Sequence, residues 1–387
     1  MSMTSRQRVQ AVLNHEIPDR VPIILGVSNA TGIKMKPYQG LKKILGIQGE
    51  DSYIYDWPEL GTIMPSESIL QRLHSDVRPL LDRFPQAVME RNQKRPPHSP
   101  FIDDWGGGQT EIEPGVWFPG YHPIPDAHTI EEIEKYSWPN MDDPYRVTLV
   151  KDQAKKLAKE NQYAIMATPW LMFPFERAFE MQGMDKFLLN LAMVPDFARA
   201  LLKKNTELCK TLLGHFLDEC GGYIDIIKIG DDLGTQERLL ISPRMYRQML
   251  KPLHAELIEF IKQRTKAKIF FHSDGDIFDL IEDFIEIGVD ILNPIQTSAG
   301  KMADLAGLKA RYQGRMVFCG AIDTQKILPF GTPDEVRQEV RRVINILGQG
   351  GEYMLASVHT IMNEVPPENI LAMVNAVEEF GHYPLKG

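Results

Sequence analysis

The 387-residue sequence predicts an α/β protein with a parallel sheet covered by helices. From about residue 145 onward, short β-branched runs alternate with amphipathic stretches, as expected of consecutive βαβ units. The runs are apolar along most of their length, which is typical of strands buried on both faces. A closed barrel and an open doubly wound sheet both fit this pattern. No GxGxxG or P-loop motif follows a strand, so the commonest reason to prefer the open sheet is missing.

The individual elements follow from local composition. The segments predicted as strands are residues 21–26, 163–168, 224–229, 268–272, 290–294, 316–320 and 353–357. The segments predicted as helices are residues 148–160, 195–217, 243–264, 277–286, 333–347 and 367–380. Several helices begin at a proline, and Ser242 and Thr332 stand directly before two of these prolines, where a hydroxyl caps a helix.

The N-terminal third is irregular and rich in proline, glycine and aromatic residues, so it is predicted to form long loops. Within it, the segment DDWGGGQ allows two interpretations. Trp105 packs against the rest of the fold and the glycines form turns, or the glycines let the backbone approach a flat ligand.

Composition excludes several classes of function. Lys and Arg total 43 against 52 Asp and Glu, giving a net charge of −9 without a basic cluster, which argues against nucleic acid binding. Three cysteines, Cys209, Cys220 and Cys319, are too few for a disulfide framework and indicate a reducing compartment; Cys319 is expected in the core. No stretch approaches the ~20 apolar residues of a membrane span, and the N-terminus lacks a signal-peptide pattern. We therefore expect a cytoplasmic protein with no membrane contact.

Polar side chains follow almost every predicted strand. Because the carboxyl ends of parallel strands meet at one edge, these residues are candidates for a single site. They are Trp170, Glu176, Asp231, Asp232, Gln236, His272, Asp274, Asn293, Gln296 and His359.

His272 and Asp274 form the most informative pair. Residues two apart at a strand end face the same way, so this histidine and carboxylate can share a metal or bind one substrate. The alternatives are that Asp274 caps the following helix and that His272 is a hydrogen-bonded structural histidine.

Several long motifs resemble the uroporphyrinogen decarboxylase superfamily. They are RQRVQAVLNHEIPDRVPI, HPIPDAHTIEEIEKYSWPNMDDPYR, KIGDDLGTQERLLISPRMYRQMLKP, FFHSDGDIFDLIEDFIEIGVDILNPIQ and VPPENILAM. The resemblance covers nearly the whole chain. It implies one (β/α)₈ barrel over residues 1–387, in which residues 1–145 contain an N-terminal extension and loops that cover the barrel mouth. A homodimer is common among such proteins.

Two chemistries occur in this superfamily, and residues separate them. Cofactor-free decarboxylases carry an arginine-rich RQAGRY loop after the first strand, where arginine holds substrate carboxylates. The corresponding residues 26–32 contain no arginine, which disfavours that activity and leaves it as the alternative. Asn29 in this loop is expected to contact the substrate.

The corrinoid-dependent methyltransferases of the superfamily bind zinc through His-x-Cys and a second cysteine, seven residues before the first proline of P-x-E-N. In this chain His272 matches the histidine, while Asp274 and His359 stand at the cysteine positions. All three remain competent metal ligands. The resemblance therefore implies a zinc site with harder nitrogen and oxygen ligands.

A harder site suits activation of an oxygen, which predicts transfer of a methyl group from an O-methyl substrate to a corrinoid on a partner protein, as in anaerobic O-demethylases. Glu176, Asp231 and Asp232 are the expected catalytic residues. The expected substrate contacts, besides Asn29, are Trp170, Gln236, Asn293 and Gln296. A non-catalytic, corrinoid-binding protein is the remaining alternative.

Overall fold

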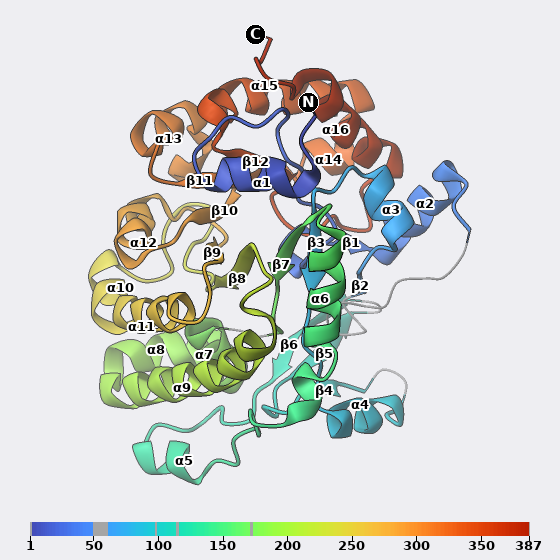
Figure 1. Ribbon diagram of the computed structural model, residues 1–387. Coiled ribbons are helices and arrows are strands. Elements are labelled where there is room, and N and C mark those ends of the chain that lie inside the picture. The colour runs from blue at the N-terminus through green and yellow to red at the C-terminus, as the bar shows by residue number, and fades with distance from the viewer. Residues whose placement is uncertain (1, 49–60, 97–98, 114–115, 171–172, 387) are drawn as a thin grey trace.

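The computed structural model describes residues 2–386 except 49–60, 97–98, 114–115 and 171–172 (Figure 1). Its centre is a parallel sheet with the strand order β12-β11-β10-β9-β8-β7-β3. The strands are β3 (Val77–Leu80), β7 (Ala164–Ala167), β8 (Ile226–Gly230), β9 (Lys268–His272), β10 (Ile291–Ile295), β11 (Val317–Ile322) and β12 (Tyr353–Ser357). The predicted strands from residue 163 onward are confirmed, and the sheet curls as expected for a (β/α)₈ barrel.

Residues 21–25 occupy the eighth position and join the two edges of the sheet. On one side, Ile24 N donates to Leu355 O and Leu355 N donates to Pro22 O, both at 2.9 Å. On the other side, Asp76 N donates to Ile23 O at 2.8 Å. Only Ile23 forms a bridge, with Leu355, so the prediction of a regular strand over residues 21–26 is wrong. Pro22 lacks an N–H group and cannot complete the ladder.

Helices cover the outside of the sheet and mostly follow the predicted pattern (Figure 1). They are α6 (Val150–Glu160), α9 (Pro195–Cys220), α10 (Pro243–Met249), α11 (Lys251–Lys262), α12 (Ile281–Ile287), α13 (Leu305–Tyr312), α15 (Pro333–Leu347) and α16 (Pro367–Phe380). The hydroxyls of Ser242 and Thr332 accept from backbone N–H groups at the starts of α10 and α15, as predicted. The predicted helix 243–264 divides at Leu250, because Pro252 cannot continue the hydrogen bonds of α10.

Helix α1 (Ser5–Leu13) closes one end of the barrel. It contacts β3, β7 and β12, and Val9, Val12 and Leu13 join an apolar cluster with inward-facing strand residues. That cluster contains Cys319, which is buried as predicted. The polar residues that follow the strands therefore gather at the opposite, carboxyl end.

The N-terminal third contains more regular structure than its composition predicts. Strands β4 (Phe101–Ile102), β5 (Gly108–Glu113) and β6 (Val116–Tyr121) form an antiparallel sheet where long loops were expected. Asp103 pairs with Arg177 of α7 (Pro174–Gln182) at 3.0 Å, which attaches this sheet to the barrel. Trp105 is buried beneath the Arg177 guanidinium, so the packing interpretation of this tryptophan is the correct one.

The remaining short elements flank the barrel. They are β1 (Ile33–Lys34), β2 (Thr62–Ile63), α2 (Met35–Leu45), α3 (Glu67–Arg72), α4 (Gln86–Gln93), α5 (Ile130–Lys135), α8 (Met184–Met193) and α14 (Ile327–Phe330). Across the described ranges, none of the helices has the length and apolar character needed to cross a bilayer.

Candidate metal site at the carboxyl end of the barrel

The structure brings His272, Asp274 and His359 together. One ligand atom from each lies within 4.8 Å of the others. His272 ends β9, Asp274 follows two residues later, and His359 lies in the loop after β12. Asp274 Oδ2 is 3.9 Å from His272 Nε2 and 3.6 Å from His359 Nε2. Two imidazoles and a carboxylate converging at one point form a set that a divalent transition metal can occupy.

Asp274 has unused ligand capacity. Its backbone N–H donates to Asp232 Oδ1 at 2.8 Å, and its own Oδ1 is buried without a hydrogen-bond partner among the described residues. The expected alternative, capping of the next helix, does not apply to Asp274. It is Asp276 that accepts from the backbone N–H of Phe278, the first residue of the short 3-10 turn before α12.

Asn293 lies behind His272. Its Oδ1 is 2.7 Å from His272 Nδ1, and its Nδ2 donates to Cys319 O at 3.3 Å. Asn293 is fully buried. The structure thus places this predicted substrate contact against a candidate metal ligand, with both ends of its amide already engaged.

Lys228 is a residue that the sequence interpretation missed. It lies two positions after Ile226, which belongs to the apolar barrel interior, so it faces inward on β8. The ammonium interacts electrostatically with Glu176, Asp232 and Asp274. A lysine between isoleucines in a buried strand was the available signal, because a lysine at such a position requires charged neighbours.

Burial dominates the protonation of this cluster. Burial, followed by the charges of neighbouring carboxylates, raises the pKa of Glu176 and Asp274 well above its usual range, and burial also raises the pKa of Asp232. Burial lowers the pKa of His272 well below its ordinary value. For His359, whose side chain is 43% exposed, partial burial together with the nearby ammonium groups lowers the pKa to about 4. Both rings are therefore neutral at pH 7, the form that binds metals.

Asp231 differs from its neighbour Asp232. Its carboxylate accepts from the backbone N–H groups of Phe175 and Glu176 at 3.1 and 2.9 Å, and so caps the first turn of α7. Its Oδ2 also lies 2.8 Å from His254 Nε2. The structure gives this predicted catalytic residue three partners outside the metal group, an arrangement that positions Glu176.

Two of the predicted substrate contacts hold neighbouring loops. Gln296 Oε1 accepts from the backbone N–H of Gly275 at 2.7 Å, beside Asp274. Gln236 is exposed and accepts from the Ser298 hydroxyl at 3.5 Å.

The other two follow the segment 21–25 and β7, two barrel positions with only β3 between them. The backbone carbonyl of Asn29 accepts from the hydroxyl of Thr360, the residue after His359, and Asn29 Oδ1 is buried without a hydrogen-bond partner in the described structure. Trp170 N donates to Asp82 Oδ1 at 2.5 Å. Burial raises the pKa of Asp82 to about 7. Asp82 went unnoticed because β3, the strand before it, was not predicted.

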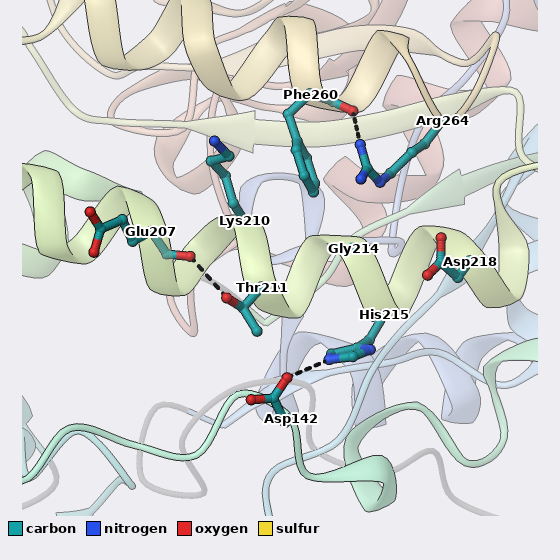
Figure 2. Close-up of a pocket in the computed structure, with 9 residues that line it drawn as sticks. All are labelled: Asp142, Glu207, Lys210, Thr211, Gly214, His215, Asp218, Phe260 and Arg264. Atoms are coloured by element: carbon teal, nitrogen blue, oxygen red, sulfur yellow. Dashed lines mark hydrogen bonds and ion pairs between the residues drawn. The ribbon is translucent and has the colours of Figure 1, made fainter.

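A separate groove of about 460 Å³ lies on the outer surface, between α9 and α11 (Figure 2). There His215 Nε2 lies 2.8 Å from Asp142 Oδ1, and the Phe260 ring lies beside Arg264. This groove shares no residue with the metal group.

A barrel with acids, imidazoles and a lysine at its carboxyl end has the arrangement of an enzyme active site. Comparison with known families then identifies the chain. Residues 112–380, more than half of the chain, match the model of the family described as uroporphyrinogen decarboxylase (URO-D). The protein belongs to this family and is an enzyme.

Individual relatives are distant. Uroporphyrinogen decarboxylase of Psychromonas ingrahamii is 28% identical over 185 residues, covering 45% of this chain and 49% of the relative. Uroporphyrinogen decarboxylase of Chlorobium limicola is 22% identical over 257 residues, covering 64% and 69%. The chain therefore spans about half the length of the first of these relatives. A solved methyltransferase from Methanosarcina mazei is 19% identical, with a TM-score of 0.68 over 98% of this chain and 99% of the other, and so shares its fold.

Proposed function

We propose that the protein is a metal-dependent methyltransferase that moves a methyl group from an O-methyl substrate to a corrinoid on a partner protein. The observation that carries the proposal is the convergence of His272, Asp274 and His359 within 4.8 Å. The M. mazei neighbour, named a methyltransferase, supports the reaction class.

The charges and hydrogen bonds around the three ligands fit a divalent cation. Asp274 Oδ1 is buried without a partner, so it has a lone pair to offer. When ionised, Asp232 and Asp274 carry two negative charges against the one positive charge on Lys228. The remaining negative charge favours a bound cation. Nitrogen and oxygen ligands also agree with the preferences of zinc.

In the proposed reaction a zinc ion held by these ligands would act as a Lewis acid toward the ether oxygen of the substrate. Glu176, whose pKa burial raises well above its ordinary range, is proposed to give a proton to the leaving oxygen. Asp231 holds Glu176 through the first turn of α7. Asp232 fixes the Asp274 backbone, and Asn29 offers its unpartnered amide oxygen to the substrate.

A cofactor-free decarboxylase is the second candidate, favoured by the names of the curated relatives. Residues 26–32 provide no arginine for substrate carboxylates. The two candidates differ in their need for metal, because the decarboxylase requires none.

The first experiment is elemental analysis of protein purified without chelator, alongside His272→Ala and His359→Cys. We expect about one zinc per chain in the unchanged protein, loss of zinc in His272→Ala, and retention in His359→Cys because a thiolate is also a zinc ligand. Methyl transfer is measured as the decrease in cob(I)alamin absorbance when methoxylated aromatic compounds are added. Metal-free protein that decarboxylates uroporphyrinogen would establish the second candidate instead.

A further inference from the structure

We propose that Asn293 is a positioning residue that fixes His272 as its Nδ1–H tautomer, so that the Nε2 lone pair faces Asp274 and His359. This inference rests on the proposed metal site and identifies the group that orients its best-held ligand.

The orientation of the Asn293 amide follows from its neighbour on β11. The Cys319 carbonyl oxygen can only accept a hydrogen bond, so the amide group 3.3 Å away must be the NH₂ end of Asn293. The Asn293 carbonyl oxygen then points the other way, to His272 Nδ1 at 2.7 Å. That oxygen can also only accept. His272 must therefore donate from Nδ1.

The remaining ring nitrogen becomes the ligand. A neutral imidazole carries one N–H, so a proton on Nδ1 leaves a lone pair on Nε2. Nε2 is the atom that lies 3.9 Å from Asp274 Oδ2. Metal-binding histidines generally donate their other N–H to an oxygen in this way, which fixes both the tautomer and the ring orientation.

The strands of the barrel hold the hydrogen-bonded series of Cys319, Asn293 and His272 in place. Asn293 is the register partner of His272 across β10 and β9, and Cys319 lies on the next strand, β11. Asn293 is fully buried, and the His272 side chain is 8% exposed.

His359 lacks an equivalent support. Within the described residues, neither of its ring nitrogens has a hydrogen-bond partner, its contacts are with Asp274 and His272, and its side chain is 43% exposed. The two histidines therefore differ in how they are oriented. His272 is pre-oriented by the barrel, whereas His359 is free to turn toward an ion from its loop.

Zinc affinity of three variants, measured by competition with a chelator, tests this inference. Asn293→Leu keeps the volume and removes the acceptor, and we expect zinc binding to weaken by about 10- to 100-fold. Asn293→Asp keeps an acceptor for the Nδ1 proton, so its affinity should recover to within about tenfold of the unchanged protein. Asn369→Leu is the matched control. It removes another buried amide, on α16, whose Nδ2 donates to the carbonyls of Leu328 on α14 and of Gly331, and it should leave zinc affinity unchanged.

A second readout does not depend on metal or on the stability of a variant. Nitrogen NMR of the metal-free, unchanged protein should show His272 protonated at Nδ1 and unprotonated at Nε2. The opposite tautomer overturns the inference, as does zinc binding by Asn293→Leu at the affinity of the unchanged protein. Absence of zinc binding in the unchanged protein would instead refute the proposed function.

Discussion

Two histidine–aspartate groups lie close together in this barrel and differ in how many of their polar atoms have hydrogen-bond partners. Behind the barrel wall, His254 lies between Asp231 and the Tyr246 hydroxyl, at 2.8 and 3.2 Å. Asp231 in turn accepts two backbone N–H groups of α7. At the barrel mouth, His272 and Asp274 approach only to 3.9 Å, and Asp274 Oδ1 has no partner among the described residues.

This difference distinguishes a structural pair from a candidate ligand-binding pair. A buried polar group without a partner costs free energy, so a fold tolerates one where something else supplies the missing interaction. His254 and Asp231 have their partners within the protein, so they stabilise the packing of α7 and α11. His272 and Asp274 leave lone pairs for a ligand.

Removing the Asp274 carboxylate should have the largest effect on zinc content and methyl transfer. Asp274→Ala deletes one of three ligands, and we expect zinc to fall from about one per chain to near zero, with loss of methyl transfer. Asp276→Ala is the control, because the hydrogen bonds of the Asp276 side chain within the described residues go to the backbone N–H groups of Phe278 and Lys301 and not to the metal group. If both variants contained the same amount of zinc per chain, Asp274 would not be a zinc ligand distinct from Asp276.

Removing His254, whose two ring nitrogens both have hydrogen-bond partners, should lower stability and leave zinc binding unchanged. His254→Leu leaves the Tyr246 hydroxyl and one Asp231 oxygen short of a partner, and we expect the free energy of unfolding to fall by about 3 kcal/mol. Zinc per folded chain should stay constant. Denaturant unfolding and elemental analysis of the same sample measure both quantities, and zinc loss without destabilisation would reverse the assignment of the two groups.

Glu180 tests whether an unpartnered atom alone marks a site. Its Oε2 is buried without a partner among the described residues, and burial raises its pKa from 4.5 to about 7. The unfolded chain therefore loses this proton at lower pH, and stability falls as pH rises from about 4.5 to about 7. Glu180→Gln should gain about 3 kcal/mol at pH 8 and nothing at pH 4, with unchanged zinc. A pH-independent difference would show that titration of Glu180 is not the cause.

The exposed pair in the outer groove should show the smallest effect. His215 and Asp142 are 45% and 74% exposed, so water competes with their interaction (Figure 2). We expect Asp142→Asn to change the free energy of unfolding by less than about 0.5 kcal/mol, with no effect on zinc. Thermal unfolding at low and high salt provides the measurement, and a larger change would give this surface pair a structural role.

Much of the barrel could be predicted because its local patterns agree with its fold. Strands β9 and β12 and helices α15 and α16 have the predicted bounds. Each strand contains an apolar run, and each of these helices starts at proline. Strand β3 was missed because Arg78 and Pro79 interrupt its four residues, and β4–β6 were missed because glycine and proline suggested loops.

The alternation of side chains in β8 contained information that composition alone did not use. Ile226 and Lys228 face the barrel interior, and continuing the period of two places Asp232 inside and Asp231 outside. The structure agrees with that division, since Asp231 bonds to α7 and His254 while Asp232 bonds to the Asp274 backbone.

The sequence by itself determined which residue types follow each strand and hence that His272 and Asp274 face one edge, because parallel strands present their carboxyl ends together. Only the tertiary structure decided that His359 comes within 3.6 Å of Asp274, and that Asn293 orients His272 instead of a substrate. The first depends on curling of the sheet, which brings the loop after β12 across to β9. The second depends on the register of the neighbouring strands β9, β10 and β11, which sets the Cys319 carbonyl against the Asn293 amide and Asn293 against His272. Such contacts between segments far apart in the sequence leave no local pattern in the chain.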